Sequence, residues 1–227
     1  MGFKLIAIRP LENCGEKFLK NLDINRIYKF YDNFEYYNGK DRIDNLIDAN
    51  EFKKVDSVKE VNKLPNDFFT TKINISAIVG KNGSGKSSII DLFIASLNQI
   101  SINLRDKGIL NTTAELQTTN TEKDSLIHCE LYYQLNNNYF QILINDTNFD
   151  FINLNGKKEF DLKHFFYTEI ISYSIYAFNS WEIGDWIDYL FHKNDSYQIP
   201  IVINPKRESK DDGWAGIINI NTESYLL

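Results

Sequence analysis

The feature that most constrains this chain is a run of closely spaced glycines between two apolar segments of different periodicity. Before Gly80, apolar residues alternate over residues 72–79, which predicts a buried central strand. From Lys86 onward, apolar side chains recur at helical spacing, which predicts a helix of about four turns whose apolar face packs on a sheet. A strand, a glycine-rich turn and a helix in immediate succession predict an α/β fold.

The glycine-rich turn matches a phosphate-binding pattern. It reads Gly80-Lys81-Asn82-Gly83-Ser84-Gly85-Lys86-Ser87 and satisfies G-x-x-x-x-G-K-[ST] in full. In such a loop the glycines let backbone N–H groups surround a phosphate, and the N-terminus of the following helix adds a positive dipole end. The alternative is a strand-to-helix turn that binds no ligand. That alternative does not explain the lysine, because a lysine directed into such a turn has no role in packing.

The chemistry of the loop assigns a role to each polar group that follows the last glycine. Lys86 supplies a compact cation for the β- and γ-phosphates and is the candidate catalytic residue, and the Ser87 hydroxyl is placed to ligate Mg²⁺. Ser88 caps the helix or contacts the α-phosphate. The predicted cofactors are ATP and Mg²⁺, and the predicted nucleotide-binding residues are Gly80, Lys81, Asn82, Gly83, Ser84, Gly85, Lys86, Ser87 and Ser88.

The residues before the loop predict two β-segments and an insertion. Residues 3–8 predict a short strand, and residues 27–37 predict its hairpin partner or an edge strand. The charged region 38–70 predicts a surface insertion, with a short helix at 44–52. After the helix that follows the glycines, the polar residues 105–124 predict a mobile loop.

Residues 125–161 alternate with a period of two, which is typical of antiparallel strands. Cys129 and Leu131 fall on one face and Glu130 and Tyr132 on the other, so we expect a half-buried strand. Asparagine-rich turns predict a three- or four-stranded meander; they lie at 136–138, 146–148 and 155–156.

The C-terminal third predicts short β-segments around one helix and one polar loop. The expected elements are a strand at 170–178, a helix at 184–192, strands at 199–203 and 217–220, and a loop at 204–212.

Composition bounds the class of protein. With 43% hydrophobic and 25% charged residues, the 227-residue chain is typical of a folded globular domain. It has no apolar stretch near the roughly 20 residues that span a bilayer and no apolar leader, so we expect a cytoplasmic location without membrane contact. Cys14 and Cys129 stand alone in the sequence, which excludes a zinc or disulfide pattern. The net charge of −6 disfavours a wide nonspecific surface for nucleic acid.

The residues that fill the loop suggest a family. Asn82-Gly83-Ser84 between the outer glycines, with a Ser-Ser pair after Lys86, resembles the ABC-type P-loop ATPase heads of the SMC-like, RecF-like and OLD-like AAA group, whose consensus is G-x-N-G-x-G-K-S-[ST]. The resemblance implies a P-loop NTPase fold, an ABC-ATPase-like head with a mixed central sheet and an antiparallel β-subdomain. It makes residues 1–227 the N-terminal part of such a head, with the remainder of the head lying outside the chain.

Two features of such heads are missing from the chain. There is no Ser-Gly-Gly-type signature segment, and the nearest imitation of an apolar strand ending in Asp-Glu places Thr147 after Asp146, so Asp146 is interpreted as a turn residue rather than a magnesium ligand. The resemblance also implies a glutamine-bearing loop, for which Asn179 and Ser180 are the nearest polar candidates, with a surface turn as the alternative.

Other candidate residues have simpler structural interpretations. The loop that contains Lys206, Arg207 and Lys210 is interpreted as solvated rather than as a nucleic-acid contact, because neighbouring acidic residues offset its positive charge. The histidines at 128, 164 and 192 are too scattered for a metal or catalytic set. By the resemblance, an adenine-stacking group would come from Arg9 or from residues 28–31.

The functional hypothesis is Mg-ATP binding. The resemblance implies an ATPase, active when the full head is present, that acts as an ATP-gated dimerisation switch through a homodimer with an ATP sandwich. It also implies a role in DNA maintenance or bacterial anti-phage defence, with DNA or a nuclease or toxin effector as partner. The alternatives are a non-hydrolysing nucleotide-binding scaffold and a small-molecule kinase.

Overall fold

A computed structural model describes residues 3–44, 52–61, 75–108, 126–145, 148–155, 184–187, 202–210 and 213–221. Contacts divide the chain into two units, one formed by Met1–Thr112 and Thr118–Leu162 and the other by Thr113–Gln117 and Lys163–Leu227. Each unit is described by itself.

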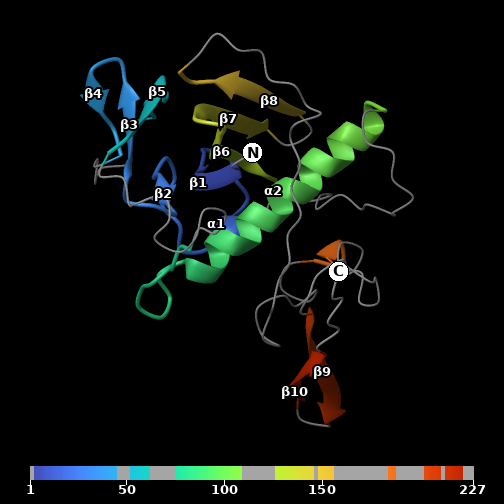
Figure 1. The fold of residues 1–227 in the computed structure, drawn as a ribbon. Helices are drawn as coiled ribbons and strands as arrows, with labels where there is room; N and C mark the ends of the chain where they lie inside the picture. Colours follow the sequence, from blue (N-terminus) through green and yellow to red (C-terminus); the bar gives the residue numbers. More distant parts are fainter. Residues whose placement is uncertain are drawn as a thin grey trace, which may run out of the picture. The chain divides into compact units, whose positions relative to one another are not determined.

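The first unit is built on a five-stranded sheet with the order β2-β1-β6-β7-β8 (Figure 1). Every strand pairing in it is antiparallel. The predicted N-terminal strand and the meander are confirmed, the meander as three strands. The strands are β1 (Phe3–Pro10), β2 (Tyr28–Lys29), β6 (His128–Leu135), β7 (Asn138–Asn145) and β8 (Asn148–Asn153).

The turn between β6 and β7 shows why the sequence makes a hairpin there. Asn136 and Asn137 adopt φ values of 50° and 65°, both left-handed. Two-residue hairpin turns of this kind match the twist of the flanking strands, and asparagine tolerates the conformation better than most residues. The register Leu135↔Asn138 follows directly from this two-residue turn.

A second, three-stranded sheet with the order β4-β3-β5 covers one face of the first. It comprises β3 (Phe34–Asn38), β4 (Asp41–Arg42) and β5 (Ser57–Glu60). Val55 and Val58 are fully buried and share a core cluster with Tyr132 of β6. The prediction of a surface insertion over 38–70 is therefore wrong for Ile43, Val55 and Val58, which are buried in this core. Most of the helix predicted at 44–52 lies outside the described residues.

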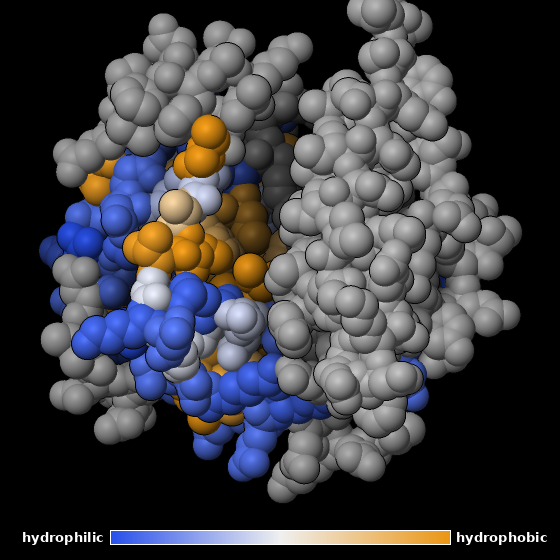
Figure 2. Space-filling view, turned by 90° about the horizontal axis from the view of Figure 1, so that it is seen from below, coloured by the Kyte–Doolittle hydropathy of each residue, from blue (hydrophilic) through white to orange (hydrophobic). Residues whose placement is uncertain are grey.

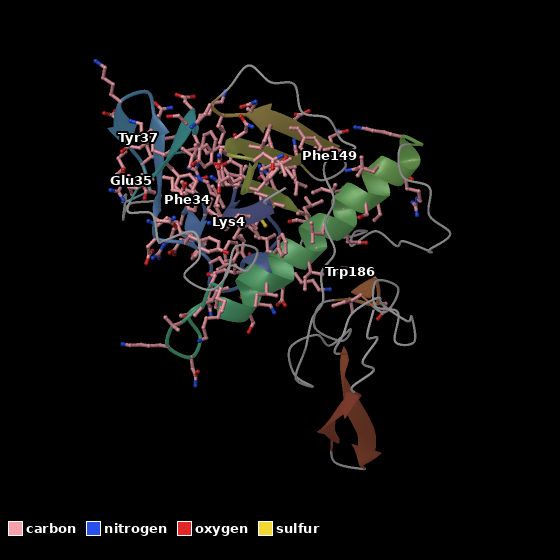
Figure 3. All side chains as sticks on the ribbon, in the orientation of Figure 1. Lys4, Phe34, Glu35, Tyr37, Phe149 and Trp186 are labelled. Carbon is pink, nitrogen blue, oxygen red and sulfur yellow. The ribbon has the colours of Figure 1, made fainter. Side chains whose placement is uncertain are left out.

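Contacts between the two sheets are visible where β1 faces β3. The Lys4 Nζ lies 5.6 Å from the centre of the Phe34 ring (Figure 3). Phe34 in turn meets the ring of Tyr139 edge-on, at 6.1 Å between ring centres. These contacts place an aromatic layer between the sheets.

The opposite face of the five-stranded sheet meets α2 (Lys86–Asp106), the predicted helix (Figure 1). The Ser96 Oγ of α2 lies 3.1 Å from the Cys129 Sγ of β6. The helix has 21 residues, which is about six turns rather than the expected four. It ends at Asp106, and residues 109–124 of the predicted loop lie outside the described residues.

Strand β6 is buried on both faces, which corrects the expectation of a half-buried strand. Leu131 is buried towards the side of Cys129 and α2, and Tyr132 is buried in the core between the sheets. The alternation in the sequence correctly separates the two faces. It does not show that a second sheet covers the more polar one.

The predicted central strand before the glycines is not found. Residues 75–79 of its range are described; they form no strand, and Val79 is 87% exposed. An apolar alternation becomes a strand only where neighbouring strands satisfy its backbone groups, and β1 already has β2 and β6 on its two sides. The mixed central sheet is likewise not found, because every strand pairing among the described residues is antiparallel.

The described part of the second unit is a hairpin of β9 (Val202–Lys210) and β10 (Gly213–Asn221). The polar loop predicted at 204–212 is therefore strand over its described residues, 204–210. Of the helix predicted at 184–192, residues 184–187 are described, and the Ile187 N–H donates to the Gly184 carbonyl at 3.2 Å in a turn. The strand predicted at 170–178 lies outside the described residues.

Candidate functional site

The phosphate-loop motif folds into a compact turn that leads into α2. Gly83 and Gly85 have φ values of 79° and 85°, a left-handed conformation that glycine adopts without steric cost. The Ser84 N–H donates to the Lys81 carbonyl at 3.2 Å, which closes the turn, and the Ile89 N–H donates to the Gly85 carbonyl at 3.0 Å, which starts the helix. The motif therefore places its backbone N–H groups at a helix N-terminus.

The lysine of the motif bends back over the loop. The Lys86 Nζ donates to the carbonyl oxygens of Gly80 and Lys81, both at 2.8 Å. A lysine ammonium has three donors and no acceptor. The ammonium is thus held at the mouth of the loop, where phosphate oxygens can serve as acceptors for it.

Two of the glycines lie close to neighbouring side chains, and one of them, Gly85, also has a left-handed φ. A Cβ on Gly80 would lie 2.5 Å from the Ser84 Oγ, and a Cβ on Gly85 would lie 2.7 Å from the Leu22 Cδ2. Both distances are shorter than van der Waals contact. The loop is therefore packed against its own turn on one side and against the chain before β2 on the other.

The two serines after Lys86 face different surroundings. The Ser87 side chain is exposed at the first turn of α2, whereas Ser88 is 4% exposed. Ser87 can therefore reach a metal ion bound beside the loop. The Ser88 side chain lies in the interior, and what Ser88 can offer a ligand directly is its backbone N–H.

The electrostatics of the helix start favour an anion. The first turn of α2 contains no acidic residue. Its N–H groups have no partner within the helix, and the helix dipole adds about half a positive charge at this end. Among the described residues no group of three His, Cys, Asp or Glu side chains could hold a metal ion. A Mg²⁺ ion here would take Ser87 and phosphate oxygens as ligands.

A cleft of about 470 Å³ opens beside the loop. Gly80, Ser84 and Lys86 line one side, and Arg26 and Tyr28 line the other. The Arg26 guanidinium lies 5.3 Å from the centre of the Tyr28 ring. Burial raises the pKa of the Tyr28 hydroxyl, so this group stays neutral at physiological pH. The structure thus brings residues 28–30, predicted as a source of an adenine contact, to the cleft.

The chain before the loop adds exposed apolar side chains to this region. Ile75 is 58% exposed, and Ile78 and Val79 line the cleft. In the view from below, apolar surface lies directly beside hydrophilic surface (Figure 2). A cleft with apolar and charged walls suits a ligand that has a flat ring at one end and charge at the other.

Arg9, the other predicted adenine contact, is buried elsewhere. Its guanidinium donates to the Asn25 carbonyl at 2.8 Å and the Lys53 carbonyl at 2.8 Å, and it pairs with Glu130 at 3.3 Å. Tyr132 donates to the same carboxylate. Arg9 therefore links the two sheets rather than lining the cleft, and that prediction is wrong.

The remaining candidates belong to other parts of the described chain or lie outside it. His128 lies in β6, where its Nδ1 contacts the Glu12 carbonyl. Lys206, Arg207 and Lys210 lie on β9 of the second unit. The other residues singled out in the sequence lie outside the described residues; they are Asp146, His164, Asn179, Ser180 and His192.

One set of loop contacts was not predicted from the sequence. The Asn21 Nδ2 donates to the Gly83 carbonyl at 2.7 Å, and the Lys20 Nζ lies 3.1 Å from the Asp91 carboxylate of α2. Both residues follow α1 (Glu16–Leu19) and are more than sixty positions from the loop in sequence. Neither belongs to the motif, so no local pattern could have indicated them.

Comparisons of the chain with protein-family models, curated proteins and solved structures found no match. Within the described ranges, no helix is both long and apolar enough to span a bilayer.

Proposed function

We propose that the chain binds a nucleoside triphosphate, with ATP and Mg²⁺ as the physiological pair, at the loop formed by residues 80–88. The observation that carries the proposal is the position of the Lys86 ammonium, held by the carbonyls of Gly80 and Lys81 directly before a helix N-terminus. A cation, unpaired N–H groups and left-handed glycines converge on one point. That combination suits a phosphate chain and has no evident purpose in packing.

Each polar group of the loop has a task in this proposal. Lys86 exchanges its two carbonyl acceptors for phosphate oxygens, and the N–H groups of the first turn of α2 donate to the same phosphates. Ser87 offers its exposed hydroxyl to Mg²⁺, which neutralises phosphate charge when bound. The nucleoside lies in the cleft beside the loop, where the Tyr28 ring in the cleft wall can stack on the base.

The resemblance of the loop to ABC-type ATPase heads supports a further step. We propose that Mg-ATP joins two P-loop ATPase heads of the SMC-like, RecF-like and OLD-like type, each containing this chain, so that ATP acts as a dimerisation switch. Hydrolysis in the dimer requires the complete head, because this chain alone lacks the signature segment and the Asp-Glu motif. A role in DNA maintenance or anti-phage defence, with DNA or a nuclease or toxin as partner, follows from the same resemblance.

Calorimetric titration of the full chain with Mg-ATP tests the binding proposal. Lys86→Ala removes the cation and its charge-assisted hydrogen bonds, so we expect ATP to bind about 100-fold more weakly, which corresponds to about 2.7 kcal/mol. Lys40→Ala is the matched control, because it removes the same charge from an exposed turn outside the cleft. Equal affinity of the Lys86 variant and the unmodified chain would refute the site.

A further inference from the structure

The connection between α1 and β2 touches the phosphate loop at two adjacent residues. The Asn21 Nδ2 donates to the Gly83 carbonyl at 2.7 Å. The next residue, Leu22, is buried, and its Cδ2 lies 2.7 Å from the position that a Cβ on Gly85 would take. Lys20, just before them, pairs with Asp91 of α2 at 3.1 Å. Three consecutive residues thus fasten this connection to the loop and to the helix behind it.

The contact made by Asn21 fixes the orientation of one peptide group of the loop. In a trans peptide the carbonyl and the following N–H point in opposite directions. Because the Gly83 carbonyl is turned towards Asn21, the Ser84 N–H is turned to the other side, where it donates to the Lys81 carbonyl at 3.2 Å. Gly83 has no side chain and a φ of 79°, so its own conformation restrains this peptide weakly.

We infer that Asn21 is a positioning residue for phosphate binding: its amide N–H holds the Gly83–Ser84 peptide in the orientation that lets the Ser84 N–H close the loop on the Lys81 carbonyl, and so keeps the loop in the conformation that leads into the N-terminus of α2. This inference rests on the proposed function and assigns to that site a residue outside its motif. Only a donor suits the position, because the atom opposite it is a carbonyl oxygen. Asn21 is itself exposed and lines the cleft, so it contributes little to the core.

The test compares Mg-ATP affinity among variants of the full chain by calorimetry. Asn21→Ala removes the hydrogen bond, and we expect ATP to bind about 2- to 10-fold more weakly. Asn21→Asp keeps the shape but opposes the Gly83 carbonyl with a carboxylate, and we expect a loss of about tenfold or more. Asn21→Gln retains the amide donor, and we expect it to bind more tightly than the alanine variant. Asn13→Asp, an exposed residue before α1, controls for the added charge.

Thermal unfolding without nucleotide separates positioning from a purely structural role. We expect the unfolding temperatures of the four variants to match that of the unmodified chain, because Asn21 is exposed. Three results would each overturn the inference. The Asn21 variants could bind ATP as tightly as the unmodified chain, Asn21→Ala and Asn21→Gln could lose the same affinity, or an Asn21 variant could fail to fold. If the Asn21 variants overturn the inference but Lys86→Ala still weakens ATP binding, only the role of Asn21 is refuted and the proposed function stands. If the unmodified chain binds no ATP, both the inference and the proposed function fail.

Discussion

The buried sheet and the phosphate loop of the first unit treat polar groups in opposite ways. In β6, the Glu130 carboxylate is 2% exposed and is satisfied by Arg9 and Tyr132. In the loop, Lys86 is held by two carbonyls of its own turn, and Ser87 is exposed at the helix start. The difference shows that polar groups of the sheet partner one another inside the core, whereas in the loop Lys86 and Ser87 lie at the surface, where the proposed ligand would reach them.

The largest effect on stability is expected in the sheet. Glu130→Ala leaves the Arg9 guanidinium buried without its carboxylate, and we expect the free energy of unfolding to fall by about 3–5 kcal/mol. Denaturation with urea measures it, and Glu12→Ala at an exposed site should change it by less than about 0.5 kcal/mol. If Glu130→Ala were as stable as Glu12→Ala, the expectation that the polar groups of the sheet serve stability would be refuted.

A smaller effect, dependent on pH, is expected at the edge of the second sheet. Burial acts to raise the pKa of Asp44, but hydrogen bonds from Arg42, the Tyr36 N–H and Lys29 outweigh it, so the pKa lies below its usual value. The side chain is fully buried, so Asp44→Asn should lower the free energy of unfolding by about 2 kcal/mol at pH 7.

The sign of the pH dependence follows from the lowered pKa of Asp44. Ionised Asp44 stabilises the fold above the unfolded-state pKa of about 3.9, and this contribution is lost as the pH falls through the lower folded-state pKa. The difference in stability between the parent chain and Asp44→Asn should therefore shrink below about pH 4. A difference that stays constant from pH 7 to pH 2 would contradict this origin.

The smallest effect on stability is expected from substitutions of two glycines, one in the phosphate loop and one outside it. Gly85→Ala and Gly39→Ala both place a side chain at a left-handed φ, which costs about 1–2 kcal/mol. A Cβ on Gly39 has no atom within 4 Å, whereas one on Gly85 meets Leu22. We expect similar modest losses of stability, with Gly85→Ala slightly larger and alone in weakening Mg-ATP binding. Equal ATP affinity of the two variants would show that the loop conformation does not matter.

The sequence predicted elements whose signal is local. The apolar spacing from Ile89 to Ile100 specifies α2, and the alternation around Leu131 specifies β6. The loop geometry was also predictable, because Gly83 and Gly85 stand where left-handed residues are needed.

The features that could not be predicted depend on distant partners. Burial of Tyr132 on the second face of β6 requires a sheet built from residues 34–60. The alternation before Gly80 lacks strand neighbours in the described part of the first unit, so it forms no strand there. The polar residues after Asn204 become strand because β10 pairs with them. The contact of Asn21 with the loop joins positions that no short motif contains.

The most direct test of phosphate recognition by the loop is a calorimetric titration of the full chain with Mg²⁺ and the series ATP, ADP and AMP. Lys86 and the start of α2 are proposed to recognise the phosphate chain, so ATP and ADP should bind at least about tenfold more tightly than AMP. This preference should disappear in Lys86→Ala. Equal affinity for all three nucleotides, or no binding of ATP, would contradict the account.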